Sequence, residues 1–156
     1  MMLHKNHKAF TMIELIFVIV VIGILSAIAI PKFAATRGDA EIAKAKATLG
    51  SVRSAVAMER QKLILRGVFD PITSLSSEAG YDKPIFDGIN GDTNSPVLEY
   101  PRQSCKNATA QGCWYTADNV TYTYKLPVSD SVDFNLTSSR FTCKVPTDPN
   151  CKLLTQ

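Results

Sequence analysis

Residues 10–31 read FTMIELIFVIVVIGILSAIAIP, and this stretch decides how the rest of the chain is interpreted. Between Leu15 and Ile30 there is no charged residue, and only Gly23 and Ser26 interrupt the apolar run. As a helix, residues 10–30 would be about 31 Å long, which is enough to cross the hydrocarbon core of a bilayer. The stretch therefore predicts a membrane-spanning helix close to the N-terminus.

A carboxylate, Glu14, lies inside this apolar stretch. An unpaired charge at the centre of a bilayer costs about 2.5–3.5 kcal/mol on insertion scales, so a simple anchor has no use for one. An ordinary secretory signal is the alternative, because Ala27-Ile28-Ala29 forms a small-x-small cleavage site after a basic start and an apolar run. Glu14 argues against that alternative and predicts a functional carboxylate that needs a cationic partner.

Residues 8–31 read KAFTMIELIFVIVVIGILSAIAIP. This segment resembles the start of type IV pilins and type II secretion pseudopilins. The resemblance implies that residues 1–9 are a leader peptide, which a prepilin peptidase removes by cutting between Ala9 and Phe10. The same enzyme would N-methylate the new terminus at Phe10. The family strongly prefers Gly before the cut, and this chain has Ala9 instead. Alanine is still small, so we expect cleavage at this position with lower efficiency.

The resemblance also implies how the helix is used in a filament. Glu14 would pair with the Phe10 amine of a neighbouring subunit during assembly, which supplies the missing cation. The stretch between Gly23 and Pro31 can lose helicity inside filaments of this family. From the residues alone, Pro31 removes one helical donor and is expected to bend or loosen the helix. Residues 10–31 are therefore predicted to form a transmembrane and assembly helix.

Charge and histidine content limit the possible functions. Loss of Lys5 and Lys8 with the leader lowers the formal charge from +3 to +1, which does not point to nucleic acid. His4 and His7 are the only histidines, and they leave with the same segment. The remaining chain cannot host a Ser-His-Asp site, a Cys-His dyad or a His-ligated zinc. We expect a protein that is not an enzyme and that holds no cofactor or metal.

The amphipathic pattern continues the helix beyond Pro31, over residues 32–67. Apolar residues recur at three- and four-residue spacing, with Glu59 as the one polar interruption. The apolar positions are Ile42, Ala45, Leu49, Val52, Val56 and Leu63. Gly67 is the predicted stop, and a helix from Phe10 to about Arg66 would be roughly 85 Å long.

Residues 68–103 are predicted to form a connecting loop, because Gly and Pro recur throughout them. Oxygen donors cluster there at Asp87, Asn90, Asp92 and Asn94, but no Glu follows at the spacing of an EF-hand. Turn chemistry is the favoured interpretation of this cluster, with calcium as the alternative.

Residues 104–156 are predicted to form a small β-domain stapled by disulfides. Strand patterns cover residues 114–116, 120–125, 132–136 and 140–144, with Val120, Tyr122 and Tyr124 expected on one face. The even number of cysteines beyond a membrane segment predicts disulfides, and zinc is the alternative. The cysteines are Cys105, Cys113, Cys143 and Cys151, which allow three pairings. The pilin resemblance implies a terminal loop between Cys143 and Cys151.

The fold expected from these patterns is α+β and pilin-like: a long N-terminal helix packed on a small antiparallel sheet. The predicted function is that of a structural subunit of a type IV pilus or a type II secretion pseudopilus, which includes minor subunits. The alternative is a pilin-like protein that binds DNA or a surface during uptake or adhesion. The expected partners are prepilin peptidase, other subunits, an inner-membrane assembly platform, the lipid bilayer, and DNA or a secreted substrate.

Lysines and arginines do not set the orientation, since Lys5 and Lys8 precede the span and Lys32 and Arg37 follow it. The resemblance decides it, because the peptidase of this family acts on the cytoplasmic side. A single-pass protein of the inner membrane is therefore expected, with its outer domain in the periplasm and later in a filament.

Overall fold

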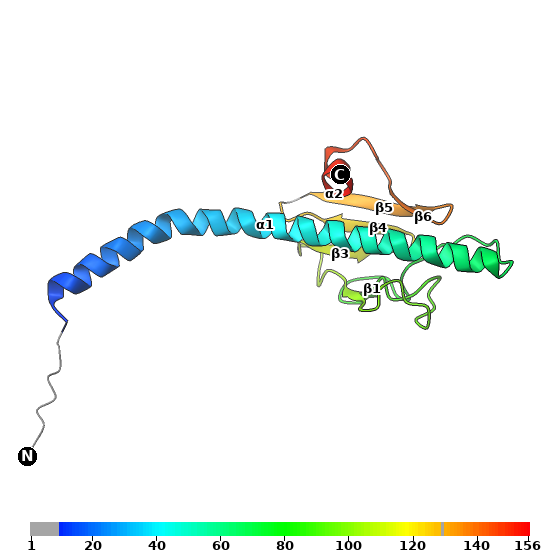
Figure 1. Cartoon of the computed structure of the whole chain (residues 1–156), viewed down its shortest axis with the longest axis horizontal. Coiled ribbons are helices and arrows are strands. Elements are labelled where there is room, and N and C mark those ends of the chain that lie inside the picture. Colours follow the sequence, from blue (N-terminus) through cyan, green and yellow to red (C-terminus); the bar gives the residue numbers. More distant parts are fainter. Residues whose placement is uncertain (1–9, 129) are drawn as a thin grey trace, which may run out of the picture. The chain divides into compact units, whose positions relative to one another are not determined.

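The computed structural model describes residues 10–128 and 130–156, apart from the side chains of residues 34 and 35. The chain divides into two compact units, residues 1–37 and residues 38–156, which we call the N-terminal and the C-terminal unit. Helix α1, Met12–Leu65, contributes to both units (Figure 1). Pro31 lies inside α1 and does not end it, so the loss of one backbone donor is tolerated within a continuous helix.

The end of α1 follows from Gly67. The N–H of Gly67 donates to the carbonyl of Ile64 at 2.9 Å, and the N–H of Val68 donates to the carbonyl of Leu63 at 2.9 Å. Gly67 has φ +78°, which is the left-handed conformation that glycine adopts without steric cost. These two bonds form a Schellman motif, and they satisfy carbonyls that the end of a helix leaves open. The predicted stop at Gly67 is confirmed.

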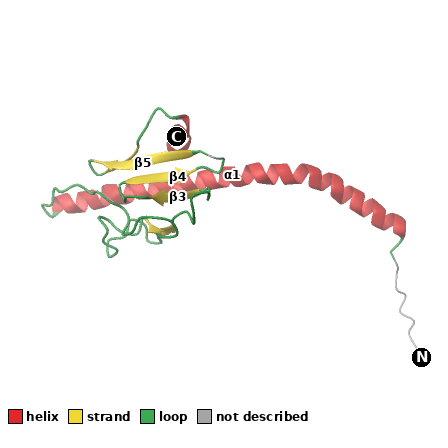
Figure 2. Ribbon diagram, turned by 180° about the vertical axis from the view of Figure 1, so that it is seen from behind, coloured by secondary structure: helices red, strands yellow, loops and turns green. Residues whose placement is uncertain are grey.

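A four-stranded antiparallel sheet forms the centre of the C-terminal unit, with strand order β3-β4-β5-β6 (Figures 1 and 2). Its strands are β3 (Cys113–Thr116), β4 (Thr121–Lys125), β5 (Ser131–Thr137) and β6 (Arg140–Cys143). Each strand pairs with the next along the chain, so the sheet is a simple meander. Val120 lies before β4 and is 48% exposed, so it does not join Tyr122 and Tyr124 on the buried face as predicted.

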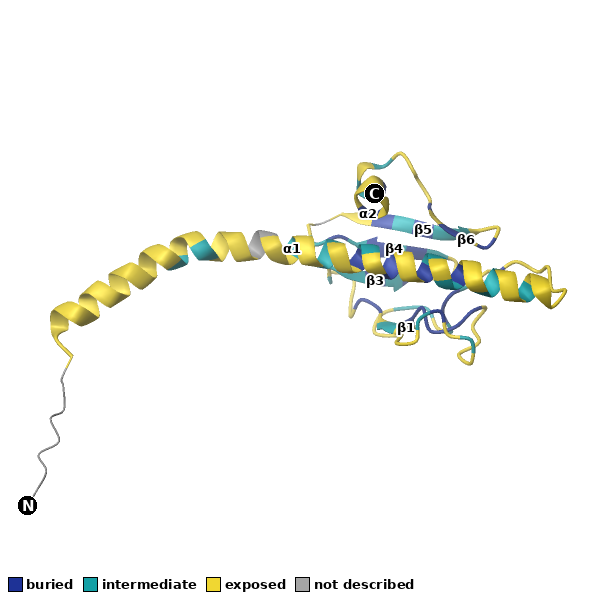
Figure 3. Cartoon of the chain, in the orientation of Figure 1, coloured by how far each residue is buried: buried dark blue, intermediate teal, exposed yellow. Residues whose placement is uncertain are grey.

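The core lies between the second half of α1 and one face of this sheet, and Figure 3 shows the buried stripe of the helix. The helix contributes four buried side chains: Ala45, Leu49, Val52 and Val56. The sheet contributes Trp114, Tyr122, Tyr124, Val132, Phe134 and Phe141. Two hydrogen bonds join the layers, from Tyr124 Oη to the carbonyl of Glu41 at 3.0 Å and from Arg53 Nε to the carbonyl of Phe141 at 3.0 Å. The α+β, pilin-like fold predicted from the sequence is confirmed.

Three small elements complete the C-terminal unit. Strands β1 (Pro84–Ile85) and β2 (Arg102–Gln103) form a two-stranded antiparallel pair within the segment predicted as a connecting loop. Helix α2, Pro149–Thr155, is capped by the carboxylate of Asp148, which accepts from the N–H of Asn150 at 2.7 Å. The sequence patterns did not predict these elements, because each is too short to show a period.

Both disulfides join near neighbours in the sequence. Cys105 pairs with Cys113, and Cys143 pairs with Cys151, each at a sequence separation of 8. The second disulfide encloses the start of α2 rather than an irregular loop alone. Cys143 and Cys151 also belong to the buried core.

Candidate assembly site at the N-terminus

Phe10 is the first residue of the predicted site that the structure describes. Residues 1–9, and with them the predicted leader and Ala9, lie outside the described part of the chain. Phe10 precedes the first turn of α1, and its side chain is 78% exposed. Glu14, Gly23 and Pro31 all lie within α1.

Thr11 and Glu14 form a reciprocal cap at the start of α1. The N–H and the Oγ1 of Thr11 both donate to Glu14 Oε2, at 2.9 Å and 2.8 Å. The N–H of Glu14 approaches Thr11 Oγ1 at 3.3 Å, and the carbonyl of Thr11 accepts the first helical bond from Leu15. This arrangement is a capping box, in which a Thr at the N-cap and a Glu three residues later satisfy each other's backbone donors.

The capping box gives Glu14 a role within its own chain that our interpretation of the sequence missed. Its signal, Thr-x-x-Glu before an apolar run, is present at residues 11–14. Within the described residues, no cationic side chain pairs with Glu14. A carboxylate at a helix N-terminus is also favoured by the helix dipole. Glu14 can therefore start the helix and still offer negative charge to a group from another molecule.

The apolar side chains that follow have no cover from their own chain. The large apolar residues from Met12 to Ile30 are all exposed, as the yellow half of α1 in Figure 3 shows. By length and composition, α1 includes a segment that could cross a membrane, and none of that segment is buried. Gly23 has no atom within 4 Å of the position that a Cβ would occupy. Since exposed apolar surface of this extent is unfavourable in water, the segment needs lipid or other helices around it.

Sequence comparison bears directly on this segment. The profile described as "Prokaryotic N-terminal methylation motif" matches residues 4–30. The chain carries a prepilin-type methylation motif. The chain is also 53% identical over 51 residues to the type IV narrow pilus major component PilA5 of Thermus thermophilus. That match covers 33% of this chain and 44% of the relative, so less than half of the relative's length is spanned. No solved structure is significantly similar to the chain.

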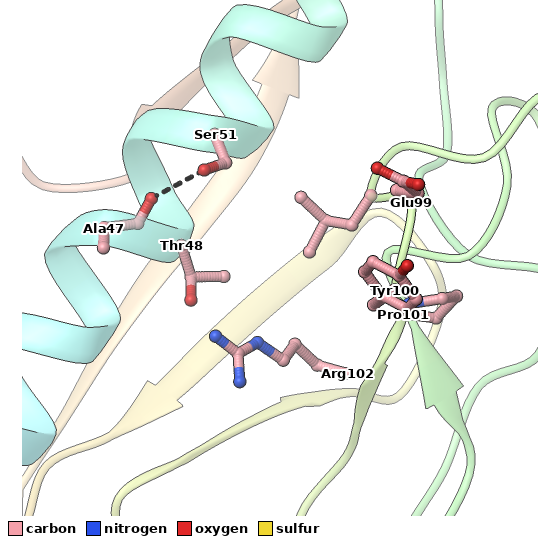
Figure 4. A pocket seen from close by; sticks show the side chains of 8 residues that line it. Ala47, Thr48, Ser51, Glu99, Tyr100, Pro101 and Arg102 are labelled. Atoms are coloured by element: carbon pink, nitrogen blue, oxygen red, sulfur yellow. Dashed lines mark hydrogen bonds between the residues drawn. The ribbon is translucent and has the colours of Figure 1, made fainter.

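The C-terminal unit has a groove between α1 and the residues around β2 (Figure 4). The groove has a volume of about 450 Å³, and Thr48, Ser51, Tyr100 and Arg102 are among its lining residues. Ser51 donates its hydroxyl to the carbonyl of Ala47 at 3.0 Å, and Glu99 and Arg102 are the charged side chains that line the groove. The groove therefore presents one carboxylate and one guanidinium beside the helix.

Three of the clustered oxygen donors of the loop accept hydrogen bonds from its own segment. Asp87 is buried, and its carboxylate accepts from the N–H of Ser77 at 2.9 Å and from the hydroxyl of Ser77. Asn90 Oδ1 accepts from the N–H of Thr73 at 2.8 Å. Asp92 Oδ1 accepts from the N–H of Asn94 at 2.9 Å. The oxygens of Asp87, Asn90 and Asp92 thus accept hydrogen bonds from the protein itself, and the bond between Asp92 and Asn94 is a local turn.

Proposed function

We propose that this type IV pilin-like chain is a structural subunit of a type IV pilus. The observation that carries the proposal is the pairing of a methylation motif with an apolar helix that its own chain leaves exposed, and with Glu14 in that helix. A subunit must rest in the membrane before assembly and pack against other subunits afterwards, and both states need such a helix. The similarity to a type IV narrow pilus component favours a pilus over a secretion pseudopilus.

The proposed processing follows the motif. Prepilin peptidase removes residues 1–9 by cutting between Ala9 and Phe10, and the new amine of Phe10 is methylated. Residues 10–31 then form the membrane and assembly helix, and residues 32–67 form the half that packs on the sheet. Residues 68–103 connect it to the disulfide-stapled β-domain of residues 104–156. The C-terminal unit lies in the periplasm, where disulfides form readily.

Glu14 acts in assembly in this proposal. Its carboxylate pairs with the Phe10 amine of a neighbouring subunit while it keeps the N–H of its own Thr11 satisfied. A carboxylate has about four lone-pair sites on its two oxygens, so both interactions can exist together. An assembled filament also covers the exposed apolar residues of α1. Gly23 and Pro31 would allow the helix between them to extend there.

A set of substitutions separates the two roles of Glu14. Glu14→Gln keeps an oxygen acceptor for the capping box and removes the charge, whereas Glu14→Ala removes both. Thr11→Ala removes the hydroxyl of the cap and keeps the charge. We expect leader cleavage in all three variants, no filaments from Glu14→Gln or Glu14→Ala, and filaments from Thr11→Ala. Electron microscopy of sheared filaments and mass spectrometry of the membrane fraction measure the two outcomes.

The controls identify which part of the proposal would fail. Mass spectrometry of the native protein should show a chain that begins at methylated Phe10. A chain that begins at Ile30 would instead establish an ordinary signal peptide. Filaments from Glu14→Gln at the level of the unchanged protein would leave Glu14 with the capping role only.

A further inference from the structure

Two tyrosines stack on the face of the sheet that points away from α1. Tyr115 lies on β3 between the buried side chains of Trp114 and Thr116, so its ring is on the opposite face. Tyr81 comes from the segment before β1, and the two ring centroids are 4.3 Å apart with an interplanar angle of 18°. Tyr81 is 37% exposed, so the stacked pair presents aromatic surface to solvent.

The backbone holds Tyr81 in place independently of this stacking. The N–H of Gly80 donates to the carbonyl of Thr116 at 2.8 Å, and the N–H of Asp82 donates to the carbonyl of Cys105 at 3.0 Å. Hydrogen bonds on both sides of Tyr81 therefore fix its segment against the edge of the sheet. The ring is presented on a rigid support, which is the arrangement that binding sites use to limit the entropy lost on binding.

Lys125 joins the tyrosine pair to a polar groove. Its ammonium lies 5.2 Å from the ring centroid of Tyr81 and 5.6 Å from that of Tyr115, within the range of a cation–π interaction. The same ammonium donates to the carbonyl of Ala108 at 2.6 Å. Lys125 also lines a groove of about 440 Å³ together with Asp130, between the loop of the first disulfide and the start of β5.

A hydroxyl and a carboxylate lie beside the aromatic pair on this face. Thr123 on β4 lies opposite both Tyr115 and Asp133 in the strand register. Thr123 Oγ1 donates to Asp133 Oδ1 at 2.7 Å. The aromatic pair thus lies at one edge of a row of side chains that can donate and accept hydrogen bonds.

Charge separates the candidate ligands for this face. Residues 38–156 contain thirteen basic and thirteen acidic side chains, so the C-terminal unit has no net positive charge. Proteins that bind single-stranded nucleic acid combine stacking aromatics with a positively charged groove that follows the phosphates. Here Asp130 lies in the groove with Lys125, and Asp133 lies on the sheet face beside it. The surroundings favour a neutral ligand over a polyanion.

We propose that Tyr81, Tyr115 and Lys125, with the polar groove beside them, form a binding site for neutral saccharides built from β-linked pyranose rings. When all hydroxyls of a pyranose are equatorial, the two faces of the ring carry only C–H groups. Such a face stacks on an aromatic ring, whose negative face attracts the polarised C–H hydrogens. The equatorial hydroxyls then point sideways, where Thr123, Asp130 and Asp133 offer hydrogen-bond partners. The groove volume is within the range of small-molecule sites, about 300–1,000 Å³.

Isothermal titration of the full-length chain with cellotetraose tests this site, in a detergent whose headgroup is not a sugar. Cellotetraose is neutral, and the ring hydroxyls of its β-linked glucose units are equatorial, apart from the anomeric hydroxyl of the α form at the reducing end. We expect saturable binding, and a loss of about ten-fold in affinity for Tyr81→Leu, which fills the same space without a ring face. Tyr81→Phe keeps the ring and should bind within about three-fold of the unchanged chain. Phe69→Leu is the matched control, because Phe69 is an exposed aromatic residue that does not line this groove.

Three results would overturn the proposal. The first is no binding of cellotetraose by a chain with both disulfides intact. The second is equal binding by Tyr81→Leu and the unchanged chain, which would place the saccharide elsewhere. The third is binding of a (dT)12 oligonucleotide in place of cellotetraose, with an affinity that falls steeply as salt rises, which would assign this face to nucleic acid. The same titration of filament-deficient Glu14→Gln should give unchanged binding, so failure of the assembly proposal and failure of this one are distinguishable.

Discussion

The two halves of α1 belong to one continuous helix, yet they are stabilised by different surroundings. From Met12 to Ile30 the large apolar side chains are all exposed, whereas Ala45, Leu49, Val52 and Val56 in the second half are buried against the sheet. Backbone hydrogen bonds continue through both halves, apart from the one donor that Pro31 lacks. The main difference lies in the surroundings of the side chains. The second half is part of a folded core, and the first half is prepared for surroundings that other molecules provide.

This difference explains why the first half is apolar on all sides, whereas the second half is apolar along one stripe only. A helix that packs on a sheet buries one stripe and keeps polar residues elsewhere. A helix that passes from lipid to a bundle of neighbouring helices meets apolar surroundings on all sides, so it can be apolar throughout. Thr11 and Glu14 mark the start of the apolar half, and their polar groups satisfy each other.

The largest expected difference between the halves is in the cost of removing an apolar side chain. Leu49→Ala should lower the free energy of unfolding of the C-terminal unit by about 2–5 kcal/mol, because Leu49 is 2% exposed and leaves a cavity. Ile19→Ala should change it by less than about 0.5 kcal/mol, because Ile19 is 58% exposed in the N-terminal unit. Thermal unfolding of the full chain in micelles, followed by near-ultraviolet circular dichroism, measures both. Equal costs would mean that the first half also packs in the core.

Removal of either disulfide should lower the stability of the C-terminal unit and leave the first half of α1 unchanged. In the chain-entropy model each loop contributes about 2–3 kcal/mol, and the two loops have the same sequence separation of 8. The Cys143→Ala/Cys151→Ala variant should cost more than Cys105→Ala/Cys113→Ala, because both of its sulfurs belong to the core. Limited proteolysis of these variants in micelles should release fragments of the C-terminal unit, while the first half of α1, covered by detergent, stays protected. Cleavage of the helix at the same rate would contradict this separation.

The sequence predicted elements that repeat a pattern over many residues. The apolar stripe from Ile42 to Leu63 and the alternation in β4 are long enough to predict a helix and a strand. Gly67 predicts the end of the helix. The pattern Thr-x-x-Glu at residues 11–14 also predicts the capping box, but we interpreted Glu14 only as a partner for another subunit, because it lies in an apolar stretch. Helix α2 has only seven residues, which is too short to show a helical period of apolar residues in the sequence. It depends on the cap at Asp148 and on the second disulfide.

The pairing of Tyr81 with Tyr115 could not be predicted at all. The two residues are far apart in the sequence, and the backbone hydrogen bonds of Gly80 and Asp82 hold the segment of Tyr81 beside Tyr115. Disulfide pairing was open for a related reason. Four cysteines allow three pairings, and the choice is made by the three-dimensional distances between them.

Substitution of two glycines, one in each unit, should show a smaller difference in stability between the units. Gly112→Ala should destabilise the C-terminal unit by about 1–2 kcal/mol or more, because Gly112 has φ +69° and a Cβ there would meet the carboxylate of Glu41. Gly23→Ala meets no neighbour and should leave the unfolding of that unit unchanged, while it raises helix propensity by up to about 1 kcal/mol. The melting temperature reports the first effect. A lower melting temperature for Gly23→Ala would show that the first half supports the core.

The smallest expected effect concerns the hydrogen bond that joins the second half of α1 to the sheet. Tyr124→Phe removes the donor to the carbonyl of Glu41 and should cost about 1 kcal/mol at pH 8. Burial raises the pKa of Tyr124 to about 12 from a usual value of 10.0. Below pH 10 the phenol is protonated in both the folded and the unfolded chain. As pH rises from about 10 to about 12, the unfolded chain releases a proton that the folded chain keeps, so stability falls.

Tyr124→Phe has no such proton to release, and its stability should fall less steeply over the same pH range. The difference between the two proteins should therefore narrow from pH 10 and change sign before about pH 12, because the linkage effect of the raised pKa exceeds the roughly 1 kcal/mol of the hydrogen bond. Tyr122 remains in both proteins, and burial raises its pKa to about 12 as well, so the variant keeps part of the alkaline sensitivity. Urea unfolding at a series of pH values measures the two slopes, with Tyr100→Phe as the exposed control. Parallel curves for Tyr124→Phe and the unchanged chain would contradict this account. They would mean that the Tyr124 phenol ionises as easily in the folded protein as in the unfolded one, so that burial does not keep it protonated.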